Sequence, residues 1–276
     1  MRKKSFIEGF AVVPHIVWLI LFVILPLVFV VYFAFTGPDG SFSFSNITNL
    51  TRYGNIFLLS ICFALISTVI CFLIGYPLAY FMSRMKPKTQ KILIIILMLP
   101  MWISLLIRTY SLMAILDNGG LLNSLFESLG ITKVHIVGTP GAVILGMVYD
   151  FLPYMVLPIY TSLSKLDVKY YEAASDLGAG SVKTLFKVAL PLSLPGVISG
   201  ITMVFVPSIS TFYISQKLGG GLFDLIGDTI ERQFQNVSTY NMGAAVSLVM
   251  MILILASVAV MNHFSEGDDS EGGIIV

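Results

Sequence analysis

Uncharged apolar segments, each long enough to cross a membrane, alternate with polar joints along this chain of 276 residues. A helix needs about 20 mostly apolar residues to cross ~30 Å of hydrocarbon. Six such segments are bounded by charges or turn residues, at about 11–35, 56–82, 92–116, 140–163, 194–215 and 242–263. The pattern predicts an all-α membrane protein, with one transmembrane domain (1–276) of six helices.

The positions of Lys and Arg predict the orientation of these spans, because basic residues near span ends stay in the cytoplasm. The alternate joints hold only four, whereas the N-terminus and the joints after the second and fourth spans hold eleven: Arg2, Lys3, Lys4, Arg84, Lys86, Lys88, Lys91, Lys165, Lys169, Lys183 and Lys187. Both termini are therefore expected in the cytoplasm. The first apolar run is longer than the ~7–15 residues of a signal peptide, so we expect it to remain as a span.

Composition excludes several classes of protein. Apolar residues make up 57% of the chain and charged residues 11%, too few to cover a water-facing surface. A net charge of +1 excludes a polybasic nucleic-acid binder. Cys62 and Cys71 are interpreted as packing residues. His15 and His263 lie near the ends of spans and His135 lies in a joint, so no metal site or catalytic triad is expected. The acidic end Glu266, Asp268, Asp269 and Glu271 is interpreted as a solvated tail.

The polar joint at 166–193 is longer than a turn between two spans requires. Asp167 suits the N-cap of a short helix and Gly178 its C-cap. A second helix is expected to begin near Ser181 and to stop at Pro191. The two helices, hinged at 178–180, form a compact unit whose apolar side chains need a partner surface; a helix lying on lipid headgroups is the alternative.

One motif in this joint resembles the EAA loop of binding-protein-dependent ABC importer permeases. The matching residues are Glu172-Ala173-Ala174, then Gly178, then Val188-Ala189-Leu190-Pro191, with Val188 standing where the family pattern has Ile. The stretches at 75–81, 106–110 and 152–158 extend the resemblance to the spermidine/putrescine permease subfamily.

The resemblance implies a type I ABC importer permease bundle in the cytoplasmic (inner) membrane of a prokaryote. The implied partners are a second permease, two ATP-binding subunits and an extracytoplasmic substrate-binding protein. Only one carboxylate, that of Asp150, lies within a predicted span. One carboxylate supplies only half of a site for a cationic substrate, so the second permease is expected to be non-identical.

No G-x-x-x-x-G-K-[ST] motif occurs in the chain, so ATP and Mg are expected on the partner ATPase, and this chain is expected to be no enzyme and to bind no cofactor. By resemblance, Glu172 pairs with a basic residue of the ATPase, Ala173 and Ala174 allow close approach, and Gly178 forms the bend. Leu190 and Pro191 complete the motif. Glu172→Lys or Gly178→Asp is expected to abolish transport while the protein still reaches the membrane.

Two charges, Arg108 and Asp150, lie inside spans, where charges are costly and usually face a cavity or a partner. Arg108 either reaches the outer headgroups or has a structural role near an outer gate. Asp150 either binds a cationic substrate as an unpaired carboxylate or pairs with Arg108. The sequence leaves both choices open.

The fifth span carries a second set of candidates. Pro207 is expected to break its helix, and broken helices at membrane depth expose backbone to a cavity. Phe212 and Tyr213 can stack on an alkylammonium chain, while Ser210 and Thr211 either contact substrate or satisfy carbonyls freed by Pro207. Four further aromatic residues either line the same cavity or belong to an interfacial belt: Trp102, Tyr110, Tyr149 and Tyr154.

These observations predict a permease subunit of an ATP-driven importer for spermidine or putrescine. An importer of another small solute, amino-acid-like or a phosphonate, is the nearest alternative because the EAA loop reports coupling and not substrate. An ion-coupled carrier is a more distant one, since carriers usually show more buried acids and a two-half repeat.

Overall fold

The computed structural model describes residues 6–37 and 39–269, and the side chains of 13–37 and 39–263. Arg2, Lys3, Lys4 and Glu271 lie outside the described residues, as do the side chains of Glu266, Asp268 and Asp269. The described part is helical, with one isolated β-bridge between Thr36 and Phe42. The chain forms two compact units, Met1–Asn55 with Thr229–Leu253 and Ile56–Asp228 with Ile254–Val276.

The first unit holds the N-terminal helices and parts of the last two. Its elements are α1 (Phe6–Leu19), the π-helical turn η1 (Ile20–Ile24), α2 (Leu25–Ala34), α3 (Ser45–Thr48), η2 (Asn49–Tyr53) and η5 (Val237–Thr239), with portions of α14 (Ile226–Gln235) and α15 (Tyr240–Asp269). Ala34 packs against Ala244, Ala245 and Leu248, so small residues bring α2 close to α15 within this unit.

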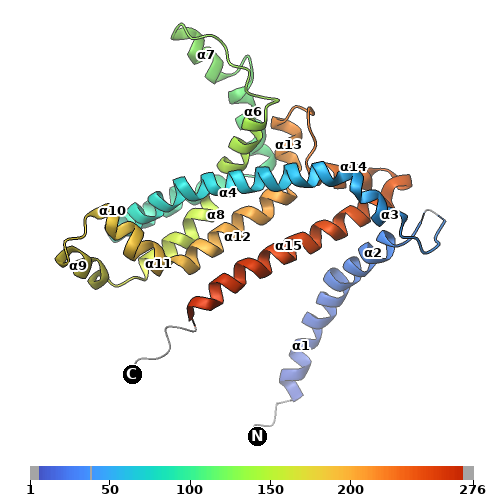
Figure 1. Ribbon diagram of the computed structural model, residues 1–276, viewed down its shortest axis with the longest axis horizontal. Coiled ribbons are helices and arrows are strands. Elements are labelled where there is room, and N and C mark those ends of the chain that lie inside the picture. Colours follow the sequence, from blue (N-terminus) through green and yellow to red (C-terminus); the bar gives the residue numbers. More distant parts are fainter. Residues whose placement is uncertain (1–5, 38, 270–276) are drawn as a thin grey trace. The chain divides into compact units, whose positions relative to one another are not determined.

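The second unit contains the remaining helices. They are α4 (Gly54–Ser83), α5 (Pro87–Met98), η3 (Leu99–Trp102), α6 (Leu105–Leu116), α7 (Leu121–Ser128), α8 (Pro140–Ser164), α9 (Val168–Asp176), α10 (Ser181–Thr184), η4 (Leu185–Ala189), α11 (Leu190–Leu192), α12 (Leu194–Ser210) and α13 (Tyr213–Leu218). Figure 1 shows α4, α8 and α12 running side by side.

Glycines allow these three helices to approach one another closely. A Cβ added at Gly196 of α12 would lie 2.5 Å from Ser162 Cβ of α8, and one at Gly200 would lie 3.0 Å from the carbonyl oxygen of Met155. On α4, a Cβ at Gly75 would lie 3.1 Å from Met155 Cγ. Backbone contact of this kind is how membrane helices associate where lipid removes the hydrophobic driving force.

Four helices are long and apolar enough to cross a membrane: Val13–Ala34, Ser45–Ser83, Pro140–Ser164 and Val237–His263. Two further helix pairs qualify only as bent pairs, Pro87–Trp102 with Leu105–Ser128 at 93°, and Ser181–Leu192 with Leu194–Ser210 at 75°. The described residues therefore contain four candidate spans, or up to six if each bent pair is one span.

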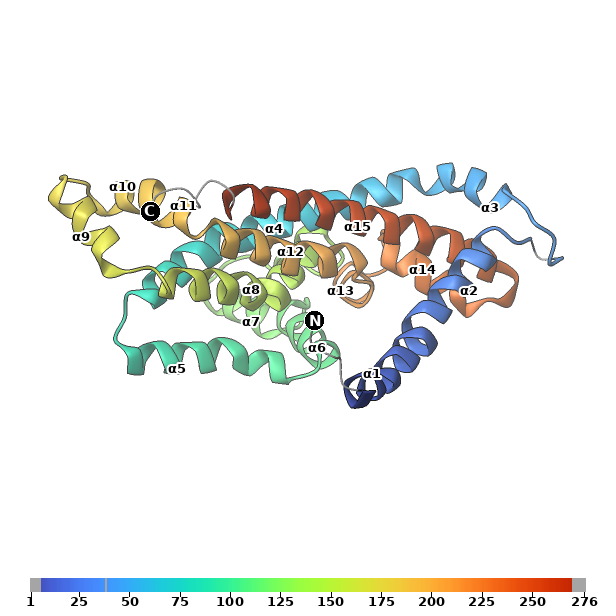
Figure 2. The ribbon, with the colours of Figure 1, turned by 90° about the horizontal axis from the view of Figure 1, so that it is seen from below.

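The third apolar run, 92–116, is not the continuous helix that the sequence predicted. Helix α5 ends at Met98, the turn η3 follows, and Ile103 and Ser104 have extended backbone before α6 begins. Pro100 lies in this turn, where it has no N–H to donate to the carbonyl four residues earlier. Figure 2 shows the change of direction between α5 and α6.

Candidate functional site

A compact two-helix element, residues 167–193, lies beyond the ends of α8 and α12 (Figures 1 and 2). Asp167 caps α9 by accepting a hydrogen bond from the Lys169 backbone N–H at 3.0 Å. Gly178 closes this helix with a φ of +71°, in the left-handed region that favours glycine. Both caps and the hinge at 178–180 confirm the predicted local structure.

The sequence predicted that the second helix of the element stops at Pro191, but the helix continues past this residue. Helix α10 continues through the π-helical turn η4 into α11, which contains Pro191 and ends at Leu192. The Leu190 N–H bonds to the carbonyl of Leu185, five residues earlier, and thus widens the turn directly before Pro191. This wider turn accommodates the proline ring, which in an α-helix clashes with the carbonyl four residues before it.

Helix α9 has an exposed face and a buried face. Glu172 and Ala173 are exposed, whereas Tyr171 and Ala174 are buried against the rest of the second unit, with 6% and 7% of their surface exposed. The predicted role of Ala174 in close approach to a partner is therefore not supported by its position, because it faces its own chain. Apolar side chains at the outer end, including Leu177 at 85% and Phe186 at 61%, remain exposed.

Tyr171 attaches α9 to the end of α4. The guanidinium carbon of Arg84 lies 3.6 Å from the centroid of the Tyr171 ring, and the Tyr80 ring lies 6.4 Å away on the same helix end. A cation–π contact contributes about 0.5–1 kcal/mol when exposed and about 2 kcal/mol when desolvated. Burial raises the pKa of Tyr171, and the nearby Arg84 acts in the opposite direction, so the phenol stays neutral at physiological pH.

Sequence reasoning missed the Tyr171–Arg84 contact. The positions of Lys and Arg predict orientation but do not show which of them stacks on an aromatic ring. The signal in the sequence is an aromatic residue directly before Glu172 on a short helix, about 100° around the helix from it, so that the two side chains face different surroundings.

Hydrogen bonds tie the neighbouring helix ends together. Gln90 of α5 donates through Nε2 to the carbonyls of Ser83 at 3.0 Å and Met85 at 2.8 Å, and its Oε1 accepts from the Tyr160 hydroxyl of α8 at 3.0 Å. These bonds join α4, α5 and α8 on the side of the two-helix element.

The two intramembrane charges form an ion pair. Arg108 Nη1 of α6 lies 3.0 Å from Asp150 Oδ1 of α8, and the two side chains are 7% and 1% exposed. The Thr109 hydroxyl is 3.4 Å from Asp150 Oδ2, and within the described residues Arg108 Nε has no hydrogen-bond partner. The pairing alternative is thus the one the structure shows: Asp150 is not an unpaired carboxylate and Arg108 does not reach a headgroup surface.

Pro207 does not break the fifth helix. Helix α12 continues through it to Ser210, and the break lies at Thr211 and Phe212, before α13 begins. The Ser208 and Ser210 hydroxyls bond to carbonyls of the same helix, at 2.7 Å from Val204 O and 3.2 Å from Val206 O. Serine bonding to the helix backbone therefore accounts for these two hydroxyls, although neither bond reaches the Met203 carbonyl that Pro207 leaves without its usual donor.

Two of the predicted aromatic residues come together, and the others do not join them. The rings of Tyr110 on α6 and Tyr213 on α13 meet edge to face at 5.8 Å. Lys217 Nζ lies 5.1 Å from the Tyr110 centroid and 5.6 Å from the Tyr213 centroid. Trp102 is 76% exposed and Phe212 41% exposed, whereas Thr211 is buried. Sequence reasoning missed Lys217, which it counted only among the basic residues of a joint.

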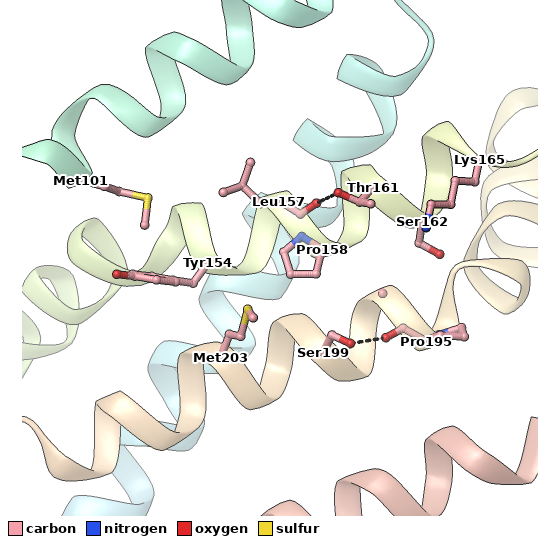
Figure 3. A pocket seen from close by; sticks show the side chains of 11 residues that line it. Met101, Tyr154, Leu157, Pro158, Thr161, Ser162, Lys165, Pro195, Ser199 and Met203 are labelled. Carbon is pink, nitrogen blue, oxygen red and sulfur yellow. Dashed lines mark hydrogen bonds between the residues drawn. The ribbon is translucent and has the colours of Figure 1, made fainter. Parts of the chain in front are cut away.

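A groove of ≈ 640 Å³ lies between α8 and α12, with Met101 at one side (Figure 3). Its lining is mostly apolar, with hydroxyl groups that are already bonded to their own helices: Thr161 donates to Leu157 O and Ser199 to Pro195 O, both at 2.8 Å. Of the residues that the sequence suggests for a substrate cavity, Tyr154 lines this groove, whereas Tyr110, Tyr213 and Asp150 do not. Among the described residues no group of His, Cys, Asp or Glu has the arrangement of a metal site.

Comparison with known proteins gives a consistent result. Residues 73–267 match the family described as binding-protein-dependent transport system inner membrane component. The chain is 39% identical over 253 residues to the spermidine/putrescine transport system permease protein PotB of Escherichia coli (strain K12), covering 88% of this chain and 92% of that protein. It is 38% identical over 247 residues to PotB of Haemophilus influenzae (strain ATCC 51907 / DSM 11121 / KW20 / Rd), covering 86% of each.

Among solved structures, a chain of a bacterial ABC transporter involved in the import of the acidic polysaccharide alginate superposes with a TM-score of 0.81. The superposition covers 96% of each chain at 18% identity, so it supports the fold and not a shared substrate.

Proposed function

The chain belongs to the family of binding-protein-dependent transport system inner membrane components, and from this membership we propose that it is the permease subunit of an ATP-driven polyamine importer. The observation that carries the substrate class is its 39% identity to a spermidine/putrescine permease, over 92% of that protein's length. As a permease subunit it is not an enzyme. Family membership favours this reading over an ion-coupled carrier.

The proposed topology places one span within each bent helix pair, at 92–116 and at 194–215, and leaves the two-helix element in the cytoplasm. Together with the four long helices this makes six spans in a single permease domain, 1–276, in the cytoplasmic membrane of a prokaryote. The distribution of Lys and Arg supports cytoplasmic termini and a cytoplasmic two-helix element.

The two-helix element is proposed to contact an ATP-binding subunit through its exposed face. Glu172 and Ala173 lie on this face, beyond the ends of α8 and α12, and Gly178 sets the bend between the helices. Leu190 and Pro191 continue the second helix toward α12. Two ATP-binding subunits holding ATP and Mg, a second permease and an extracytoplasmic binding protein complete the proposed assembly. The expectation of a non-identical second permease depends on an unpaired Asp150, and the ion pair with Arg108 removes that argument.

Exchange of the charge at Glu172 tests this contact. Glu172→Lys is expected to abolish uptake of radiolabelled spermidine while the protein still reaches the membrane, because the new charge would repel a basic partner residue. Glu127→Lys, on the exposed end of α7, is the charge-matched control and should transport normally. Normal uptake by Glu172→Lys would remove the proposed contact.

For the substrate path we propose the aromatic pair Tyr110 and Tyr213. These rings hold a primary ammonium group in the structure, that of Lys217, and spermidine and putrescine carry the same group. Four further residues are weaker candidates for the path, because they do not contact the Lys217 ammonium: Ser210, Thr211, Phe212 and Trp102. Asp150 and Arg108 contribute by fixing α6 to α8 rather than by touching substrate.

Loss of one ring tests the aromatic pair. Tyr213→Leu is expected to raise the KM for spermidine uptake about tenfold, which corresponds to ~1.4 kcal/mol of binding. Tyr213→Phe keeps the ring and should leave KM within about twofold. Equal KM values for the Leu and Phe variants would exclude the pair from the path.

A further inference from the structure

Helix α9 is joined to the membrane helices through one large buried side chain. Among the described side chains of α9, Tyr171 combines large size with burial, and its neighbour Glu172 points to the exposed face. Apart from the two ends of the helix, a force applied to the outer face of α9 can therefore pass to the membrane helices through the buried side chains of Tyr171 and the smaller Ala174.

We propose that the stack of Tyr171 on Arg84 is the mechanical joint that carries movement of α9 into the membrane helices. Tyr171 and Arg84 are then positioning residues for transport. This inference rests on the proposed contact between α9 and an ATP-binding subunit, and it specifies how that contact acts on the permease.

The two side chains of the stack are in direct contact. The Arg84 guanidinium carbon lies 3.6 Å from the ring centroid, which is direct van der Waals contact, and Tyr80 lies near the same ring with its centroid 6.4 Å away. The buried Tyr171 hydroxyl has no hydrogen-bond partner within the described residues. The ring, and not the hydroxyl, thus makes the attachment.

Arg84 directly follows α4 and lies between two residues held by Gln90. The Gln90 side chain bonds to the carbonyls of Ser83 and Met85 and accepts a bond from Tyr160 of α8. Displacement of Arg84 would therefore move the ends of α4, α5 and α8 together.

A second link joins the other end of the two-helix element to the same helix. The Tyr76 hydroxyl of α4 and the Ser193 hydroxyl lie 3.1 Å apart and are buried. Helix α4 is thus held at both ends of the element, by Tyr171 near its start and by Ser193 where it ends. A rotation of the element would be transmitted as a shift of α4.

The charge of Arg84 and its planar shape can be separated by substitution. Arg84→Lys keeps the positive charge, and so keeps the orientation signal, but replaces a flat guanidinium with an ammonium on a flexible stem. Tyr171→Phe keeps the ring, whereas Tyr171→Leu removes it. A joint that depends on stacking should tolerate Phe at 171 and fail with Leu at 171 or Lys at 84.

The test uses the complete importer, with its binding protein and spermidine, in proteoliposomes. We expect Tyr171→Leu and Arg84→Lys to lower the number of spermidine molecules imported per ATP hydrolysed by at least fivefold. Assembly with the ATP-binding subunits should be unchanged in co-purification, and Tyr171→Phe should stay within twofold of the parent. A purely structural role would lower uptake and ATP hydrolysis together and leave their ratio unchanged.

The double variant Tyr171→Leu/Arg84→Lys adds a second check. If both residues act in one joint, the double variant should be no worse than either single variant. Losses that multiply, or an unchanged ratio in both single variants, would overturn the joint.

Failure of the joint can be told from failure of the proposed coupling contact. If Glu172→Lys is inactive but Tyr171→Leu and Arg84→Lys couple normally, the contact stands and the joint is wrong. If Glu172→Lys transports normally, the contact itself is wrong.

Discussion

Arg108 and Asp150 illustrate how a single pair of residues constrains this membrane protein. Each would be an uncompensated charge in a buried site without the other, and removal of one partner from a buried ion pair costs about 3–5 kcal/mol. Replacement of both by apolar residues removes both desolvation penalties and is often neutral or stabilising. Single and double substitutions can therefore distinguish a structural ion pair from a carboxylate that binds substrate.

For this pair we predict that Asp150→Asn and Arg108→Gln each lower the melting temperature of the purified protein in detergent. The double variant Arg108→Leu/Asp150→Leu should recover much of the loss and should retain spermidine uptake. The opposite pattern, an unchanged melting temperature with lost uptake in Asp150→Asn, would return Asp150 to the substrate path.

Local residue roles were predictable from the sequence, whereas contacts between distant residues were not. The cap at Asp167 and the left-handed Gly178 follow from residue type and a few neighbours. The partner of Asp150 is 42 residues away on a helix whose direction depends on a bend. The stacking of Tyr171 on Arg84 likewise required knowing which face of α9 turns inward.

At the scale of elements, the bend at Gly178 can be tested with substitutions that differ only in how readily they adopt the left-handed backbone conformation. A Cβ at this position would have nothing within 4 Å, so only its φ of +71° limits substitution. An ordinary residue in the left-handed region costs about 1–2 kcal/mol, whereas Asn adopts it more readily.

Gly178→Asn is therefore expected to keep most of the spermidine uptake, and Gly178→Val to lose most of it. Gly178→Asp should also fail, because it differs from Asn by a charge placed near the proposed partner surface. Equal uptake by the Asn and Val variants would show that the bend does not need this conformation.

The contact between α8 and α12 makes a second element-scale prediction. Gly196→Ala should lower the melting temperature, because its Cβ would lie 2.5 Å from Ser162 Cβ and 2.7 Å from the Pro158 carbonyl oxygen. Overpacking of this kind costs about 1–3 kcal/mol. Gly54→Ala is the matched control, since its Cβ would have nothing within 4 Å, and it should leave the melting temperature unchanged or slightly higher. A Gly196→Ala protein as stable as the control would contradict the close contact.

Hydropathy located the apolar segments but not their bends. A run of apolar residues looks the same whether its helix is straight or folded back, so 92–116 was predicted as one helix although it turns by 93°. Prolines gave an incomplete signal, because Pro100 precedes a bend while Pro207 and Pro191 lie within helices. The difference lies in the neighbouring turns, such as the π-helical turn before Pro191, which periodicity does not reveal.

At the scale of the whole molecule, the proposed orientation in the membrane depends on the positions of a few basic residues. Introduced cysteines can test it after Cys62 and Cys71 are replaced by Ala. With the proposed six spans, a cysteine at Asn118 should react with a membrane-impermeant maleimide from outside intact cells. One at Lys183 should react only after permeabilisation. Labelling of Lys183 from outside, or protection of Asn118, would contradict the proposed topology.

The bend between α5 and α6 also affects how the chain is made. Helix α5 has 12 residues, about 18 Å, which is shorter than ~30 Å of hydrocarbon, and the next limb carries Arg108. Arg108 leaves the ribosome 42 residues before Asp150, and an arginine at a helix centre is inserted at a cost of about 2.5–3.5 kcal/mol. In the proposed topology, Arg108 therefore gains its buried partner only after the fourth segment has been synthesised, so we expect membrane insertion and folding of this region to overlap with translation.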